Sequence, residues 1–124
     1  MNLLALAIAG ATGTLARYGL GLLITGWLRG FGSSFPLATL IINVLGSFVL
    51  SYVTTLALNG RLSPDLRLAI GTGFCGAFTT FSTFELEAHG LISRGANLEA
   101  GLYVIGNLLL GFVAVLLGRW LVTG

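Results

Sequence analysis

Hydroxyl groups and aromatic rings alternate within one short stretch of an otherwise apolar segment. The stretch contains Thr79, Thr80, Phe81, Ser82, Thr83 and Phe84. Hydroxyls donate hydrogen bonds and ring edges are electropositive, so both can contact an anion without a full charge. A single membrane Ser or Thr usually bonds to the carbonyl four residues earlier, and membrane phenylalanines usually face lipid or fill a core. Four hydroxyls on several helix faces exceed what packing readily satisfies, so this pattern indicates a pathway for a polar solute.

A glycine just before this stretch favours a break in the helix. Gly76 lies three residues ahead of the first hydroxyl. A break within a membrane requires that the freed carbonyl groups be buried in protein, hydrated or given an ion. Carbonyl oxygens suit hard cations, of which sodium is one. The sequence therefore predicts a discontinuous helix around the hydroxyl cluster.

Three further polar side chains lie inside apolar segments and leave alternatives open. Arg17 costs between about 2.5 and 17 kcal/mol at mid-membrane, so it attracts an anion, snorkels to the interface, or pairs with carbonyls at a helix end. Asn43 and Asn107 serve either as hydrogen-bonding links between helices or as ligands.

The acidic residues favour an anion over a cation or proton as the solute. Glu85 and Glu87 are expected near the end of the apolar segment that holds the hydroxyls, and Asp65 and Glu99 near segment starts. No carboxylate is then expected at mid-membrane. These arguments lead to a small, hard anion, with fluoride and chloride both open.

The composition places these groups in a membrane protein. Of the 124 residues, 56% are hydrophobic and 8% are charged, and the mean hydropathy is +0.99, whereas soluble domains carry about 25% charged residues. Each of four apolar stretches exceeds the roughly 20 residues that a helix needs to cross the hydrocarbon core. The sequence predicts one all-α, multi-pass domain over residues 1–124 in the inner (plasma) membrane. The expected spans are 3–28, 37–58, 68–92 and 98–122.

The charges between the spans leave the orientation nearly undetermined. All six basic residues are arginines, and they are divided almost evenly between the two sides of the predicted bundle. Because an excess of cytoplasmic Lys and Arg fixes topology, this chain is compatible with insertion in both orientations. Four helices scarcely enclose a pore, so we also expect a homo-oligomer. Ser63, before Pro64, resembles a helix N-cap.

Motifs in all four segments resemble the Fluc (CrcB-type) fluoride channels. The resemblance covers nearly the whole chain, and the third motif is the most specific. The motifs are Gly10-x-x-Gly13-x-x-x-Arg17, Pro36-x-x-Thr39-Leu40-x-x-Asn43-x-x-Gly46, Gly73-Phe-Cys-Gly76-x-x-Thr79-Thr80-Phe81-Ser82-Thr83-Phe84, and Asn107-Leu-Leu-Leu-Gly111.

The resemblance implies an antiparallel, dual-topology homodimer with two fluoride pores at its interface and passive export of cytoplasmic fluoride. Asn43 would be a pore-lining donor, and the ring edges of Phe81 and Phe84 would contact the ion. Further donors or positioning groups would line the same anion pathway, namely Thr80, Ser82, Thr83, Tyr103 and Asn107.

The same resemblance implies a structural sodium ion at the dimer centre, bound by main-chain oxygens of Gly76 and Thr79. Arg17 would lie near an entrance or anchor the break. Three positions depart from the expected pattern: Ala77, Glu85 and Gly111. These departures concern the freedom of the break and the outer pathway.

Two other classes compete with a channel. A small four-span multidrug exporter requires a membrane-embedded carboxylate in its first span, where this chain has Arg17 and no acid. A non-transporting membrane scaffold would show no selective ion flux. We do not expect an enzyme, because His89 has no evident nucleophile or metal-ligand set beside it.

Overall fold

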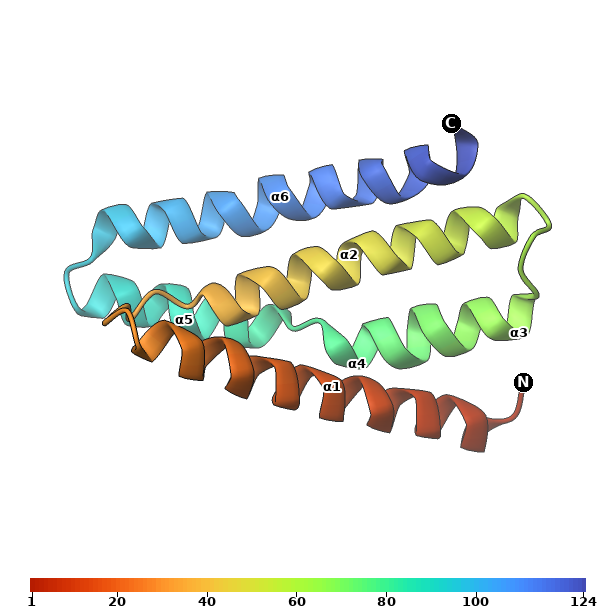
Figure 1. Ribbon diagram of the computed structural model, residues 1–124, viewed down its shortest axis with the longest axis horizontal. Coiled ribbons are helices and arrows are strands. Elements are labelled where there is room, and N and C mark those ends of the chain that lie inside the picture. The colour runs from red at the N-terminus through yellow and green to blue at the C-terminus, as the bar shows by residue number, and fades with distance from the viewer.

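Four antiparallel helical segments lie side by side in the computed structural model, which describes residues 1–124 (Figure 1). Three are continuous helices: α1 (Leu3–Arg29), α2 (Leu37–Leu58) and α6 (Asn97–Thr123). The third segment in chain order consists of several pieces. These are α3 (Pro64–Arg67), the π-helix η1 (Leu68–Cys75), α4 (Gly76–Phe78) and α5 (Phe81–Ser93).

The continuous helices α1, α2 and α6 are long and apolar enough to cross a membrane. The third segment changes its hydrogen-bonding pattern within η1 and is interrupted between α4 and α5, so none of its pieces reaches that length alone. The expected all-helical architecture with a broken third helix is confirmed. Both chain termini lie at the end of the bundle that carries the α2–α3 turn (Figure 1).

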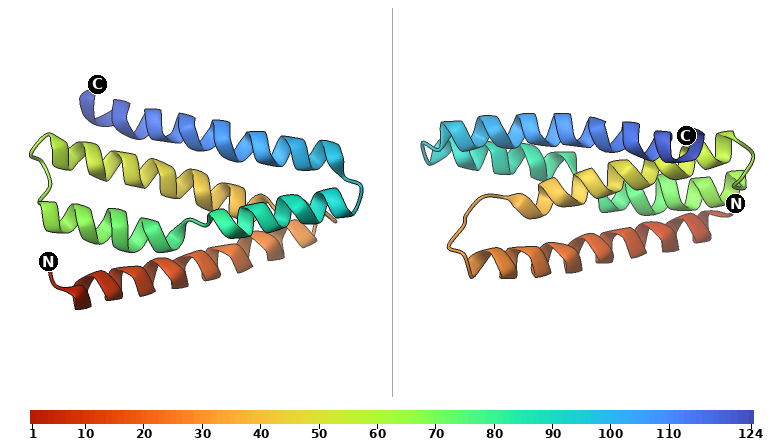
Figure 2. Two further views of the ribbon diagram at one scale, coloured as in Figure 1. Left: turned by 180° about the vertical axis from the view of Figure 1, so that it is seen from behind. Right: turned by 45° about the horizontal axis from the view of Figure 1, so that its top comes forward.

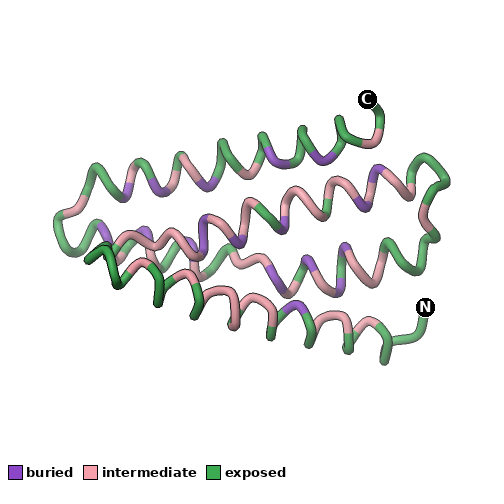
Figure 3. The backbone as a smooth tube through the Cα atoms, viewed as in Figure 1, coloured by how far each residue is buried: buried purple, intermediate pink, exposed green.

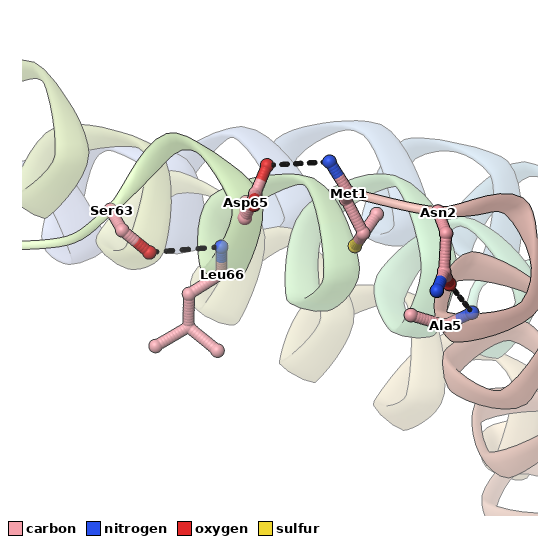
Figure 4. A network of polar contacts seen from close by, with 6 residues as sticks. All are labelled: Met1, Asn2, Ala5, Ser63, Asp65 and Leu66. Carbon is pink, nitrogen blue, oxygen red and sulfur yellow. Dashed lines mark hydrogen bonds and ion pairs between the residues drawn. The ribbon is translucent and has the colours of Figure 1, made fainter.

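Side-chain caps begin two of the helical segments, as their sequences favour. The Asn2 side chain accepts a hydrogen bond from the Ala5 amide at 2.8 Å, and the Ser63 hydroxyl accepts one from the Leu66 amide at 3.2 Å (Figure 4). Each cap satisfies an amide that has no partner in the first helical turn. The predicted Ser63 cap is confirmed.

The start of α1 is also joined to the start of the third segment. The Met1 ammonium donates to Asp65 Oδ1 at 2.9 Å (Figure 4). The Asp65 side chain is 70% exposed, so this ion pair contributes little to stability.

The helices pack in neighbouring pairs, with α2 against α6 and α1 against η1 and α4 (Figure 2). At the second contact α1 approaches its neighbour through a glycine. A Cβ atom added to Gly13 would collide with the carbonyl group of Phe74. Small residues permit this close approach in membrane bundles, and it fixes the half of the third segment that precedes the break.

The interior of the single chain is narrow, and much of its outer surface is apolar. Only 19 of the 124 residues are buried, and they follow the inner faces of the helices (Figure 3). Large hydrophobic side chains are exposed along α1 and α6, as expected for helices that face lipid or another copy. One core cluster joins α2, α5 and α6 and comprises Leu40, Phe84, Ala88, Leu91, Ala100 and Tyr103.

Candidate functional site

The third segment is interrupted at two threonines that adopt extended backbone conformations. Thr79 has φ −80° and ψ 159°, and Thr80 has φ −150° and ψ 117°. The break thus lies within the hydroxyl cluster, as the sequence predicted. Gly76, which was expected to favour it, is itself helical, with φ −61° and ψ −34°. Threonine suits the observed position because β-branching favours extended backbone and a hydroxyl can cap the next helix. Thr80 Oγ1 accepts from the Thr83 amide at 3.3 Å and lies 2.9 Å from Thr83 Oγ1.

The amide side chain of Asn43 holds the break from the neighbouring helix α2. Its Oδ1 accepts a hydrogen bond from the Thr80 amide at 2.9 Å, and its Nδ2 donates to the Thr80 carbonyl at 3.2 Å. In a continuous α-helix the Thr80 amide would instead donate to the carbonyl of Gly76. Asn43 therefore substitutes for the helical hydrogen bond and keeps the two pieces apart.

A second asparagine extends this contact to α6. Asn43 Nδ2 also donates to Asn107 Oδ1 at 3.1 Å, and Asn107 Nδ2 donates to the Tyr103 carbonyl at 3.0 Å. Asn107 is buried, with 8% of its surface exposed. The two amides thus join α2, α5 and α6 at one level of the bundle.

Arg17 of α1 also contacts the break. Its Nε donates to the carbonyl oxygen of Ala77 at 3.2 Å, and the residue is half-buried. This contact is the pairing with a helix-end carbonyl that was one of three alternatives for Arg17. It also places a positive charge beside the hydroxyls of the break.

Glu87 of α5 is half-buried and bonds to the neighbouring helices. It occupies the midpoint of α5, which continues to Ser93. Its carboxylate accepts hydrogen bonds from the Tyr103 hydroxyl at 2.6 Å and the Thr39 hydroxyl at 3.0 Å. The proton of Tyr103 is therefore engaged with Glu87. Sequence reasoning did not assign a role to Glu87 or Thr39; a helical projection of α5 from Thr80 would have placed Glu87 on the same face as Thr80 and Thr83.

The two phenylalanines of the cluster lie near each other but in different surroundings. Their ring centroids are 5.7 Å apart with the planes inclined by 58°. Phe84 is 7% exposed and packs on Tyr103 at 5.5 Å between centroids. Phe81 is 67% exposed. One ring is thus fixed by the core, whereas the other projects from the chain.

Three hollows follow one another from the α1–α2 turn to the break, and neighbouring ones have lining residues in common. The outer cleft, of about 540 Å³, includes Arg29 and Arg94. The inner cleft, of about 250 Å³, includes Arg17, Thr80 and Thr83. Glu87, Thr25 and Ala38 line both clefts.

The third hollow, here called the break hollow, has a volume of about 200 Å³ and is lined by Asn43, Ser47, Thr79 and Phe81 among others. Thr80 lines both the break hollow and the inner cleft. The break therefore separates a cleft that carries arginines from a smaller hollow that carries amide and hydroxyl groups.

Most of the predicted site residues meet at this break. Hydrogen bonds connect Asn43, Thr80, Thr83, Tyr103 and Asn107 to one another or to a shared neighbour. Ser82 is exposed, as is Glu85, and neither joins this set of contacts. No group of three or more His, Cys, Asp or Glu side chains is arranged to hold a metal ion.

An all-helical membrane bundle with an interrupted helix, held open by polar side chains, defines this protein as a multi-pass membrane protein with a polar site at the interruption. The chain belongs to the family described as CrcB-like protein, Camphor Resistance (CrcB), which it matches over residues 4–119.

Individual relatives agree with this assignment. The chain is 41% identical to a protein of Chlorobium chlorochromatii (strain CaD3) named fluoride-specific ion channel FluC, over 97% of this chain and 94% of the relative. It is 49% identical to the protein of the same name from Nitratidesulfovibrio vulgaris (strain DSM 19637 / Miyazaki F), over 91% and 90% of the two chains. The protein of that name from Shewanella sp. (strain ANA-3) is 43% identical over 98% and 95%.

Proposed function

We propose that this protein is a fluoride-selective ion channel, not an enzyme, and that it gives passive export of cytoplasmic fluoride. The observation that carries the proposal is the interruption at Thr79 and Thr80, held by Asn43 between an arginine-bearing cleft and the break hollow. The relatives described above are named fluoride-specific ion channels, which supports the channel part of the proposal. A helix that is broken within a membrane requires polar or ionic occupants for its freed backbone groups.

The charges along the clefts favour entry of an anion. Arg29 and Arg94 line the outer cleft and Arg17 the inner cleft, whereas Glu87 is the one carboxylate among the lining residues of either. A cleft lined predominantly by one sign of charge raises the local concentration of the opposite ion. Arginine side chains are the groups typical of anion-selective pores.

The groups at the break can replace part of the hydration shell of a small anion. The Nδ2 group of Asn43 already donates to Thr80 and Asn107, and either neutral contact can lengthen when an anion provides a stronger, charge-assisted acceptor. Thr83 and the edges of Phe81 and Phe84 supplement these donors. Ser82, which is exposed on the single chain, is a further donor of the cluster. Tyr103 and Asn107 position the donors of the break from α6.

A second, antiparallel copy completes the proposed pathway. The Phe81 ring is 67% exposed beside a hollow that opens at the surface of the single chain. Four helices leave room for a polar seam at an interface but scarcely for a central pore. A homodimer of opposed subunits would cover the exposed rings and create two equivalent pathways.

The broken segment also suits the structural sodium ion that the resemblance implies. The Thr80 amide donates to Asn43 instead of Gly76, which releases the Gly76 carbonyl from its helical hydrogen bond. Thr79 follows within the extended stretch, so its carbonyl also lacks a helical partner. Carbonyl oxygens are the ligands that hard cations prefer, and two copies would supply four. The ion would hold the interrupted segments of the two copies together, because its positive charge attracts the carbonyl oxygens of both.

Ion flux from reconstituted vesicles tests the proposal against the alternatives. Proteoliposomes are loaded with fluoride or chloride, and efflux is started by a potassium ionophore that removes the opposing voltage. A channel releases fluoride rapidly and chloride slowly without a proton gradient. A multidrug exporter would instead move an organic cation in exchange for protons, and a scaffold protein would leave both anions trapped; either result refutes the proposal.

A further inference from the structure

A second set of hydroxyl groups lies on α2, beyond Asn43 in the direction of the α2–α3 turn. Ser47, Ser51 and Thr54 follow Asn43 at intervals of four, four and three residues. Such intervals keep side chains on one face of a helix, so these groups form a stripe, here called the α2 stripe. At 1.5 Å per residue the stripe extends for roughly 16 Å, about half the thickness of the hydrocarbon core.

Two contiguous hollows lie beside this stripe along α2. The break hollow includes Asn43, Ser47 and Leu50. The next hollow, of about 350 Å³, is lined by Ser47, Leu50, Ser51, Thr54, Thr55 and Val115. Because Ser47 and Leu50 line both, the hollow space at the break continues along the contact of α2 with α6.

The hydroxyls of the stripe differ in whether their protons are engaged. Ser51 Oγ donates to the Val115 carbonyl at 2.7 Å, and the adjacent Thr55 donates to a carbonyl one turn earlier at 2.8 Å. Ser47 and Thr54 make no hydrogen bond within the chain, although both are half-buried. Both residues line the hollows, so these two hydroxyls are free to donate to a partner from outside the chain.

The opposing helix supplies no side-chain donor at the start of the stripe. Gly111 of α6 faces Ser47, since a Cβ atom added to the glycine would lie 3.8 Å from Ser47 Oγ. Of the two helices that meet at this level, α2 therefore provides the side-chain hydroxyl.

We propose that Ser47 and Thr54 contact the permeating anion after it leaves Asn43, and that the α2 stripe forms the half of the pathway that ends at the α2–α3 turn. The two residues lie two helical turns apart, roughly 10.5 Å along the axis. Ser51 lies between them, and its hydrogen bond to α6 keeps the stripe aligned with the hollow. This inference rests on the proposed channel function and adds residues on the far side of the break.

Removal of the two hydroxyls tests the inference in the vesicle assay. Ser47→Ala and Thr54→Val each remove one donor, so each is expected to slow fluoride efflux roughly two- to tenfold, the kinetic equivalent of one hydrogen bond. Ser47→Thr and Thr54→Ser retain a hydroxyl and are expected to conduct within about twofold of the unmodified protein. Thr12→Val is the matched control. The Thr12 hydroxyl donates to the Ile8 carbonyl of its own helix at 2.8 Å, and Thr12 lines none of the hollows described above.

The outcomes separate this inference from the proposed function. If the unmodified protein releases no fluoride, the channel proposal fails and the inference with it. If it releases fluoride and both hydroxyl deletions match Thr12→Val, the channel stands and the role of the stripe is refuted. A deletion that lowers dimer stability in size-exclusion chromatography but leaves flux per dimer unchanged also refutes it, because the hydroxyl then serves only the contact between copies. Slower flux restored by the hydroxyl-retaining variants supports it.

Discussion

Replacement of Asn43 by aspartate changes the charge at the break while keeping the side chain nearly the same size. The Asn43 carboxamide accepts from the Thr80 amide at 2.9 Å and donates to the Thr80 carbonyl and Asn107. Asn43→Asp preserves the acceptor and removes both donated hydrogen bonds. It also sets a negative charge where the proposed anion passes.

The expected effect follows from Coulomb's law. Two like unit charges 4 Å apart repel by about 4 kcal/mol at an effective dielectric constant of 20. Since each 1.36 kcal/mol changes a rate tenfold, fluoride efflux is expected to fall by about three orders of magnitude. The variant also lacks the Nδ2 donor that we propose contacts the ion, which lowers efflux further. Because up to two neutral hydrogen bonds are lost, about 1 kcal/mol each, it is expected to purify as a dimer with reduced thermal stability.

A chemically identical change at an exposed position outside the hollows provides the control. Asn2 caps α1, where its Oδ1 accepts from the Ala5 amide at 2.8 Å, and it lines none of the hollows described above. Asn2→Asp keeps this acceptor and is expected to leave fluoride efflux within about twofold of the unmodified rate, since exposed charges are screened by solvent. Efflux is measured with a fluoride electrode at equal protein-to-lipid ratios. Unmodified efflux through Asn43→Asp would refute the placement of Asn43 in the pathway.

Substitutions of the two rings, of Gly13 and of Arg17 have distinct expected results. Phe81→Ile is expected to slow fluoride efflux with little loss of stability in the single chain. Phe84→Ile is expected to slow efflux and also to lower the free energy of unfolding by about 1–2 kcal/mol through lost core packing. Fluoride flux equal to that of the unmodified protein in both variants would show that the rings only fill space. Gly13→Ala is expected to destabilise the fold by about 1–3 kcal/mol because of overpacking, and Gly19→Ala, where nothing lies within 4 Å of the added Cβ, is expected to be neutral in thermal unfolding. Arg17→Gln removes the charge of the inner cleft, so it is expected to lower efflux most at low ionic strength; a salt-independent effect would contradict the attraction of anions by this arginine.

Hydrophobic length and turn chemistry were enough to predict the helical architecture. Long apolar stretches implied membrane helices, and the dense hydroxyl cluster implied an interruption in the third of them. The cluster indicated the region of the interruption, but its exact position was less accessible, because glycine was expected to be the weak point. Threonine favours an extended backbone locally, yet the partner that takes the Thr80 amide is Asn43 of α2, 37 residues away in sequence.

Individual site residues were predictable where the residue type is unusual for a membrane segment. The contacts between them were less predictable, because the two partners are distant in sequence. Asn43 and Asn107 stood out singly, but their mutual contact spans 64 residues. The partners of Glu87 were not foreseen, because they belong to two other helices. Hydroxyl donors from α2 and α6 satisfy it within the bundle, and such partners reduce the cost of burying a charge.

The most direct test of the central claim is the zero-current voltage across a bilayer that contains the unmodified protein, with different fluoride concentrations on the two sides. If an anion path runs past Asn43 and the break, this voltage equals the fluoride equilibrium potential and does not move when chloride replaces an inert anion on one side. A voltage that follows the chloride or proton gradient, or the absence of any current, would contradict the claim.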